Sequence, residues 1–133
     1  MPKVLAVDDS PVIRRLVEVS LSPLDVTVVT EGDGASTCRA LTDERPDVLI
    51  LDVGLPDMTG WDVLDFARGE PALDGLPVIM LTGFGDAADR DRADAGKVSA
   101  YLVKPFRPND LRDSVKTCLF RTGDEYLGVP DSI

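Results

Sequence analysis

The sequence contains no histidine and only two cysteines. Without histidine the chain has no His-based metal site, no Ser-His or Cys-His nucleophile pair, and no means of carrying a phosphohistidine of its own. Cys38 and Cys118 lie 80 positions apart and form no C-x-x-C pair, so a zinc ribbon and a redox motif are both unsupported. We expect two reduced thiols on helices.

Long apolar runs and basic residues are also scarce. No run approaches the ~20 residues that a membrane-spanning helix needs, and the N-terminus lacks the apolar region of a signal peptide. We therefore expect a cytoplasmic protein without membrane contact. The 14 Lys and Arg stand against 24 Asp and Glu, a formal net charge of -10. This charge repels nucleic acid, so we expect no nucleic-acid binding through this domain.

The 133 residues, of which 44% are hydrophobic and 29% charged, suit one packed domain. Five short apolar runs are typical of strands, and the segments between them are long enough for helices. The runs cover residues 3–7, 26–29, 47–52, 77–81 and 99–103. This alternation predicts an α/β fold, a doubly wound five-stranded parallel sheet with helices on both faces. The domain is predicted over residues 1–120, followed by a tail or linker stub over 121–133.

Five helices are predicted between and after the strands. They cover residues 11–21, about 34–45, about 60–68, 86–96 and 108–120. Ser10 is the expected N-cap of the first helix, and Pro46 ends the second. Trp61 and Leu64 of the third are placed to face the sheet. The fourth helix has only alanine as apolar residues, so we expect it to bury little surface and to be weakly held.

Polar residues end four of the five strands. Asp8 and Asp9 follow the first, Asp52 ends the third, Thr82 follows the fourth and Lys104 the fifth. Because ligands bind outside the carboxyl ends of parallel strands, we expect these side chains on one rim. Three carboxylates repel one another, and a hard divalent cation makes their gathering favourable. Mg²⁺ suits the site because it leaves coordination positions for phosphate oxygens.

Asp52 is then the candidate nucleophile for a phosphoryl group, with Lys104 as a point charge for phosphate. Plainer interpretations exist for each residue taken alone. Asp8 and Asp9 could cap and stabilise the following helix, and Thr82 could simply end its strand. The convergence of these residues on one rim favours the chemical interpretation.

These residues resemble the receiver domains of two-component response regulators, over positions 3–120. The resemblance rests on "VDDS" with Asp8 and Asp9, "LILDVGLPDMTGWDVL" around Asp52, "IMLTG" with Thr82, and "YLVKPF" with Tyr101, Lys104 and Pro105. Asp52 follows Asp9 by 43 residues, Thr82 follows Asp52 by 30, and Lys104 follows Thr82 by 22. These intervals are similar to the family's own. The resemblance implies the flavodoxin-like strand order 2-1-3-4-5 with five helices.

The resemblance also implies chemical roles. Asp52 would accept a phosphoryl group from the phosphohistidine of a sensor histidine kinase or a histidine phosphotransfer protein. Asp9, Asp52 and the backbone carbonyl of Gly54 would contact Mg²⁺ directly, with Asp8 acting mostly through water. Lys104 would bind a phosphoryl oxygen. The chain would catalyse only its own phosphorylation and dephosphorylation, and would be a signalling protein.

A switch is implied as well. Thr82 would move its hydroxyl onto the phosphoryl group and Tyr101 would turn inward, which changes the surface of the fourth helix and fifth strand. That surface would control a downstream protein partner or an output domain outside this chain. The Lys104–Pro105 peptide bond would be cis, and the protein a monomer or weak dimer. Gly54 and Phe84 flank the path of the hydrolytic water, so the lifetime of the phosphorylated state stays open.

Three other interpretations compete with a receiver domain. A haloacid-dehalogenase-type phosphatase needs a second aspartate two residues after its nucleophile, where this chain has Gly54, or Ser10 after Asp8. A dinucleotide-binding module is suggested by "GFGDAA" at 83–88, but Asp86 would then face the pyrophosphate. A protein-interaction module with an idle acidic rim is the third, and Mg²⁺ binding distinguishes it from a receiver.

Overall fold

The computed structural model describes residues 1–83, 87–121 and 125–126. Five strands form one parallel sheet in the order β2-β1-β3-β4-β5, which confirms the predicted fold class and strand order. The strands are β1 (Lys3–Val7), β2 (Thr27–Glu31), β3 (Val48–Asp52), β4 (Val78–Thr82) and β5 (Ala100–Val103). The apolar run at 26–29 predicted β2 too short, because pairing with β1 continues through Val7↔Glu31.

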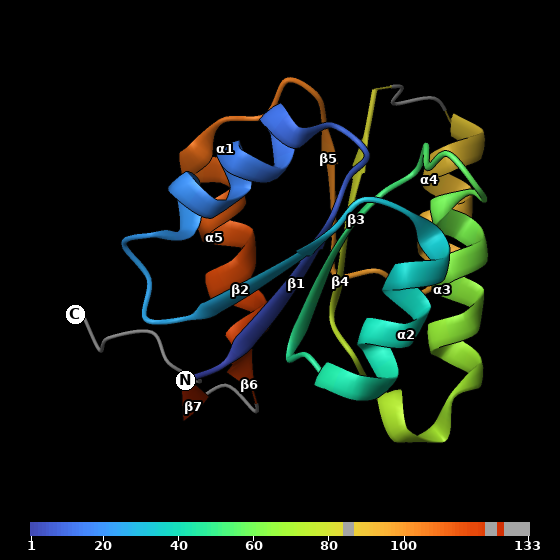
Figure 1. Cartoon of the computed structure of the whole chain (residues 1–133), viewed down its shortest axis with the longest axis horizontal. Coiled ribbons are helices and arrows are strands. Elements are labelled where there is room, and N and C mark those ends of the chain that lie inside the picture. The colour runs from blue at the N-terminus through green and yellow to red at the C-terminus, as the bar shows by residue number, and fades with distance from the viewer. Residues whose placement is uncertain (84–86, 122–124, 127–133) are drawn as a thin grey trace.

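Helices cover both faces of this sheet, as predicted. They are α1 (Pro11–Leu21), α2 (Gly34–Glu44), α3 (Gly60–Gly69), the short 3₁₀ helix η1 (Pro71–Leu73), α4 (Ala87–Ala95) and α5 (Pro108–Leu119). Figure 1 shows α1 and α5 on one face, and α2, α3 and α4 on the other. None of the helices in the described part of the chain has the length and hydropathy that crossing a membrane requires.

Alternate residues of the central strands fill two apolar layers, because successive side chains of a strand point to opposite faces. One layer lies under α2 and α3 and includes Leu5, Leu49, Leu51, Val78 and Met80; the other lies under α1 and α5 and includes Val4, Ala6, Ile50, Ile79 and Leu81. Trp61 and Leu64 of α3 are buried in the first layer, as predicted. Burial on both faces fixes the direction in which β1, β3 and β4 deliver their last residues.

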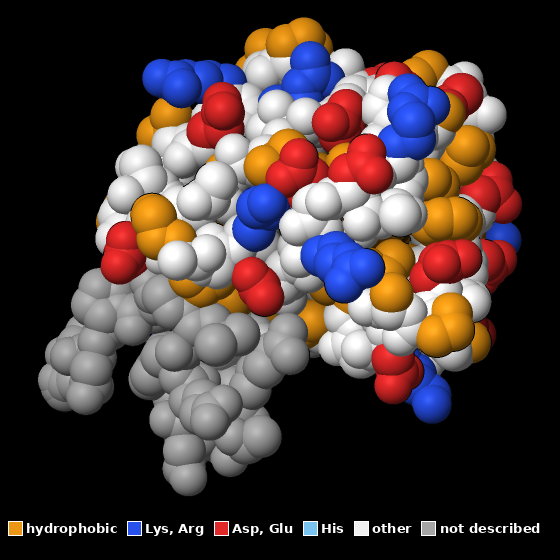
Figure 2. All heavy atoms as spheres, turned by 60° about the horizontal axis from the view of Figure 1, so that its bottom comes forward, with side chains coloured by type: hydrophobic (Ala, Val, Ile, Leu, Met, Phe, Trp, Pro, Cys, Tyr) orange, Lys and Arg blue, Asp and Glu red, His pale blue; other side chains and the backbone are white. Residues whose placement is uncertain are grey.

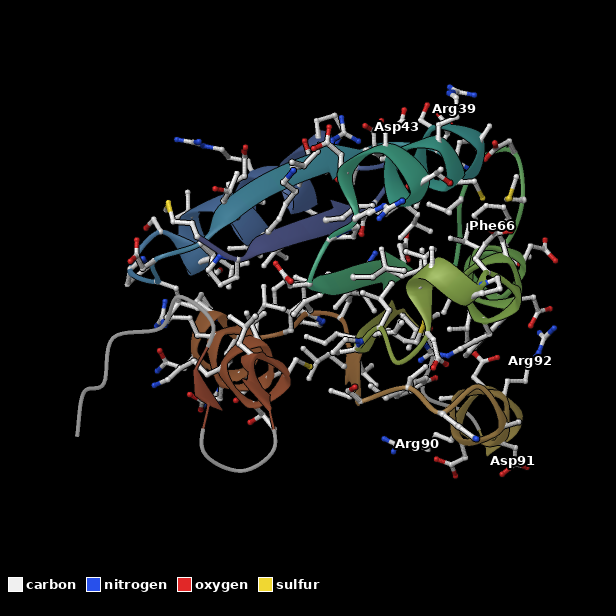
Figure 3. All side chains as sticks on the ribbon, turned by 90° about the horizontal axis from the view of Figure 1, so that it is seen from below. Arg39, Asp43, Phe66, Arg90, Asp91 and Arg92 are labelled. Carbon is white, nitrogen blue, oxygen red and sulfur yellow. The ribbon has the colours of Figure 1, made fainter. Side chains whose placement is uncertain are left out.

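The helix α4 contacts the rest of the fold in an unusual way. Among residues 89–95, the part of the helix whose burial is described, the buried apolar side chain is Ala93. Two arginines add cation–π contacts: Arg90 lies 5.0 Å from the ring centre of Tyr101, and Arg92 lies 5.2 Å from that of Trp61. Figure 3 shows Arg92 on the side of α4 that faces α3, and Arg90 on the side toward β5. The expectation that α4 is weakly held stays a prediction.

Arg68 of α3 holds the C-terminal end of α4. Its guanidinium donates hydrogen bonds to the carbonyl oxygens of Gly96 (2.9 Å), Lys97 (3.1 Å) and Leu76 (2.7 Å). Burial lowers the pKa of Arg68, and the charge of Asp74 partly offsets this effect. One end of α4 is therefore fixed to α3 and to the segment before β4.

The predicted tail over 121–133 begins within an element of structure. Strands β6 (Phe120–Arg121) and β7 (Glu125–Tyr126) pair antiparallel. The remaining tail residues lie outside the described ones, so the boundary at residue 120 stays a prediction. Figure 2 shows the end of the molecule where the strands begin, with acidic and basic side chains interspersed.

Candidate functional site

The opposite end of the sheet, where the strands finish, brings the predicted polar residues together. One carboxylate oxygen each from Asp8, Asp9 and Asp52 lie within 4.8 Å of one another. The ammonium of Lys104 lies 2.6 Å from Oδ2 of Asp8 and 3.1 Å from Oδ1 of Asp52. Thr82 is buried at the end of β4 on the same rim. The predicted convergence is confirmed, and Figure 1 shows the strand ends that produce it.

Asp8 is fixed by the start of α1. Ser10 caps the helix, since its hydroxyl accepts a hydrogen bond from the Ile13 N–H at 3.3 Å, and Pro11 stands at the first helical position. The Ser10 N–H donates to Oδ1 of Asp8 at 2.9 Å, while Lys104 takes Oδ2. Both oxygens of Asp8 are therefore engaged by protein groups. Asp9, by contrast, is exposed.

Asp52 is positioned by the loop that follows β3. Val53 continues the pairing with β4, and the loop closes through a bridge between Gly54 and Thr59 and a 2.7 Å hydrogen bond from the Gly60 N–H to the Val53 carbonyl. At Gly60 a Cβ would lie 2.2 Å from the carbonyl oxygen of Asp52, so only glycine fits. The Gly54 N–H donates to Oδ1 of Asp52 at 3.3 Å.

Burial and neighbouring charges shift the pKa values of Asp52 and Lys104. Asp52 is 5% exposed, and its burial, reinforced by the charge of Asp8, raises its pKa despite Lys104 and the Gly54 N–H, which both lower it. Burial alone would lower the pKa of Lys104, but its hydrogen bond to Asp8 and the charge of Asp52 outweigh burial and raise it. The site therefore disfavours the charged form of Asp52 and favours the charged form of Lys104.

The donor set fits a hard divalent cation. Three carboxylates and one ammonium sum to a charge of -2, which one divalent cation brings to zero. Every side-chain ligand on offer is an oxygen, as Mg²⁺ prefers, and two of the three carboxylates are buried. The cluster could therefore hold such an ion.

Thr82 and Tyr101, for which the resemblance implies a switch, lie on the neighbouring strands β4 and β5. Thr82 pairs with Val103 in the sheet, and Tyr101 stands opposite Met80, two residues earlier on β5. Tyr101 is half-buried. The Lys104–Pro105 peptide bond is cis, as the resemblance implied. Phe84, expected beside the path of the hydrolytic water, and Asp86, in the glycine-rich segment 83–88, lie outside the described residues.

Sequence reasoning missed two residues that support the site. Arg14 of α1 donates to the backbone carbonyl of Asp8 at 2.6 Å. Asp57, which lies in the quoted segment around Asp52 but was given no role, accepts hydrogen bonds from the backbone of α2. Neither contact follows from strand periodicity, because each depends on the path of a loop. A carboxylate in the turn next to the candidate nucleophile was the available signal for Asp57.

Comparisons with known proteins show what the chain is similar to. A family model described as the response regulator receiver domain matches residues 4–116. The transcriptional regulatory protein KdpE of Mycobacterium tuberculosis is 43% identical over 122 residues, which are 91% of this chain and 52% of that protein. The probable transcriptional regulatory protein TcrX of the same organism is 40% identical over 120 residues, 90% of this chain and 50% of that protein. The chain thus spans about half the length of these curated relatives.

Solved structures of response regulators have a similar fold. The chemotaxis response regulator CheY4 of Vibrio cholerae superimposes with a TM-score of 0.83 and 34% identity, covering 90% of this chain and 99% of that one. A putative response regulator from Chloroflexus aurantiacus gives a TM-score of 0.85 and 31% identity, covering 91% and 100%.

Proposed function

Because the chain belongs to the receiver-domain family of two-component response regulators, whose members signal by phosphorylation, we propose that Asp52 is its phosphoacceptor. One observation carries the proposal: the Lys104 ammonium lies between Asp8 and Asp52 at the edge of a cluster of three carboxylates. A cation beside a buried carboxylate can screen an incoming phosphoryl group.

In the proposed step, an oxygen of Asp52 bonds to phosphorus as the phosphorus–nitrogen bond of a phosphohistidine breaks. The bonding electron pair stays on the imidazole nitrogen, and Asp52 becomes an acyl phosphate. Since this chain has no histidine, the phosphohistidine belongs to a partner. Receiver domains interact with histidine kinases, and we propose a sensor histidine kinase or a histidine phosphotransfer protein, acting in the cytoplasm, as the donor.

We propose Mg²⁺ as the cofactor, held by Asp9, Asp52 and the backbone carbonyl of Gly54. Both oxygens of Asp8 are engaged by Ser10 and Lys104, which favours contact through water for Asp8. When bound, Mg²⁺ supplies positive charge that offsets the negative oxygens of the phosphoryl group. Lys104 would then leave a carboxylate oxygen and bind a phosphoryl oxygen. The chain would catalyse only its own phosphorylation and dephosphorylation.

The proposed switch uses Thr82 and Tyr101. The phosphoryl group would carry about -1.5 to -2 charges in place of the single charge of the Asp52 carboxylate, and the nearby Thr82 hydroxyl would donate a hydrogen bond to it. Tyr101 would turn into the vacated space. Because Arg90 lies over the Tyr101 ring, this movement would break a contact between α4 and β5. The changed surface would act on a downstream protein or on an output domain outside this chain, with the receiver as a monomer or weak dimer.

Phosphorylation is tested with acetyl phosphate and Mg²⁺ and read by intact-mass spectrometry. We expect the mass of one phosphoryl group to appear in the wild type, and not in the Asp52→Ala variant or in the presence of EDTA. Asp110→Ala, an exposed acid in the first turn of α5, is the matched control and should gain the group normally. A mass gain that persists in Asp52→Ala would reject the assignment. Continuous turnover of small phosphomonoesters would instead indicate a phosphatase.

A further inference from the structure

Asp57 links the loop that carries Gly54 to α2, the helix between β2 and β3. The loop runs over residues 53–59, between β3 and α3. From this loop, Oδ1 of Asp57 accepts a hydrogen bond from the Gly34 N–H at 2.7 Å, and Oδ2 accepts one from the Ala35 N–H at 2.9 Å. Gly34 and Ala35 are the first two residues of α2. The carboxylate thus caps a helix that lies more than twenty positions earlier in the chain.

The N-terminus of α2 also has a cap of its own. The first four N–H groups of a helix lack partners within the helix. The side chain of Asp33 accepts from the Ser36 N–H at 2.7 Å, and its carbonyl accepts from the Thr37 N–H. The bond from Thr37 is the first of the helix's own backbone bonds, and Asp57 supplies acceptors for the Gly34 and Ala35 N–H groups, which have no partner within the helix. The helix start is therefore complete only when the loop is docked on it.

Two further contacts hold the loop in this place. Met58 packs closely on the start of α2, since a Cβ at Gly34 would lie 2.3 Å from the Met58 Cγ. The two backbone hydrogen bonds lower the pKa of Asp57, so its carboxylate is anionic and suits the positive end of the helix. At its base the loop is closed by the bridge between Gly54 and Thr59.

We propose that Asp57 is a positioning residue for the site, which keeps Gly54 in place by fixing the loop to α2. The inference rests on the proposed function, in which the Gly54 carbonyl is a Mg²⁺ ligand. Groups that orient a metal ligand typically change metal affinity by about 10- to 100-fold when they are removed. Asp57 acts from three residues away through the loop backbone, so we expect about a three- to tenfold weakening of Mg²⁺ binding, below that range.

The test compares Asp57→Ala with Asp33→Ala. Each substitution removes one acid and one cap from the same end of α2, so lost charge and lost helix stability are matched. Only Asp57→Ala releases the loop. We expect the Kd for Mg²⁺, measured by calorimetric titration of the full chain, to rise in Asp57→Ala and to stay close to the wild-type value in Asp33→Ala. Asp57→Asn keeps one carbonyl oxygen as an acceptor, so its Kd should lie between those of Asp57→Ala and the wild type.

The phosphorylation rate with acetyl phosphate gives a second readout. We expect Asp57→Ala to need more Mg²⁺ for half-maximal rate but to reach a similar rate at saturation. Equal effects of Asp57→Ala and Asp33→Ala, or no effect of either, would overturn the positioning role while the wild-type mass gain still supports the proposed function. If Asp57→Ala does not fold, Asp57→Asn carries the same comparison, and a wild-type Kd in that variant overturns the proposal. A wild type that binds no Mg²⁺ overturns both.

Discussion

The crowding of acids at the rim predicts that Asp52→Asn stabilises the protein in the absence of divalent cations. The Asp52 oxygen lies 3.1 Å from the Lys104 ammonium, and within 4.8 Å of oxygens of Asp8 and Asp9. With an effective dielectric constant of about 20, the attraction is about 5 kcal/mol and each repulsion about 3.5 kcal/mol or more. The two repulsions together exceed the attraction by about 2 kcal/mol.

Two corrections apply to this difference. Asp9 is exposed, so solvent screens its repulsion and reduces the gain. Burial of Asp52 acts in the opposite direction, since it raises the pKa of that carboxyl and disfavours its charged form. We therefore expect Asp52→Asn to raise the free energy of unfolding by about 1 kcal/mol in EDTA.

Urea unfolding measures this change through the fluorescence of Trp61, which is the only tryptophan and is 5% exposed. Excess Mg²⁺ should reverse the order, because an ion that binds only the folded wild type stabilises it by about 2.7 kcal/mol at 100 times its Kd. Asp43→Asn is the control: Figure 3 shows Asp43 on α2, and it is exposed. Its stability relative to the wild type should not depend on Mg²⁺.

Two results would refute the reasoning. A lower free energy of unfolding for Asp52→Asn in EDTA would mean that Lys104 attracts Asp52 more strongly than the acids repel it. A wild type that gains no stability from Mg²⁺ would mean that the acid cluster is not a cation site. The outcomes are independent, because the first concerns the protein alone and the second its ligand.

Three other changes have defined outcomes. Gly60→Ala should lower the free energy of unfolding by about 1 to 3 kcal/mol, because its Cβ would meet the carbonyl oxygen of Asp52, and urea unfolding checks this. Arg68→Leu should cost about 2 to 4 kcal/mol, since three backbone carbonyls lose a charged donor, and it should speed hydrogen exchange at the end of α4. The lowered pKa of Asp57 means that its stabilising effect is present above its usual value of 3.8 and is lost as the pH falls through the lowered pKa. The stabilities of wild type and Asp57→Asn should therefore converge on acidification, as followed by unfolding and an NMR titration of the carboxyl.

Much of the fold was predictable because the sheet is parallel and buried. Strands such as β3 and β4 are covered on both faces, so they stand out as apolar runs with helices between them. The edge strand β2 was placed two residues short. Its last residues, Thr30 and Glu31, are polar, and only the hydrogen bonds to β1 make them part of a strand.

The site was predictable as far as strand ends determine it. Asp8, Asp52 and Lys104 stand at the carboxyl ends of parallel strands, so their meeting follows from topology. The contacts of Arg14 and Asp57 do not follow in this way. Each joins a side chain to the backbone of a loop or helix start whose position depends on several elements at once. Periodicity contains no information about such contacts.

The same distinction indicates where a change at the site can spread. Asp52 and Thr82 end β3 and β4, whose residues are all buried, so added charge at Asp52 cannot be relieved by spreading these two strands. The helix α4 differs, since Ala93 is the buried apolar side chain among its residues 89–95, and Arg68 ties its C-terminal end to α3. Over residues 89–95, where the burial of its side chains is described, a shift of α4 would disturb few apolar contacts. Under the proposed function, α4 should therefore respond by pivoting about the end that Arg68 holds.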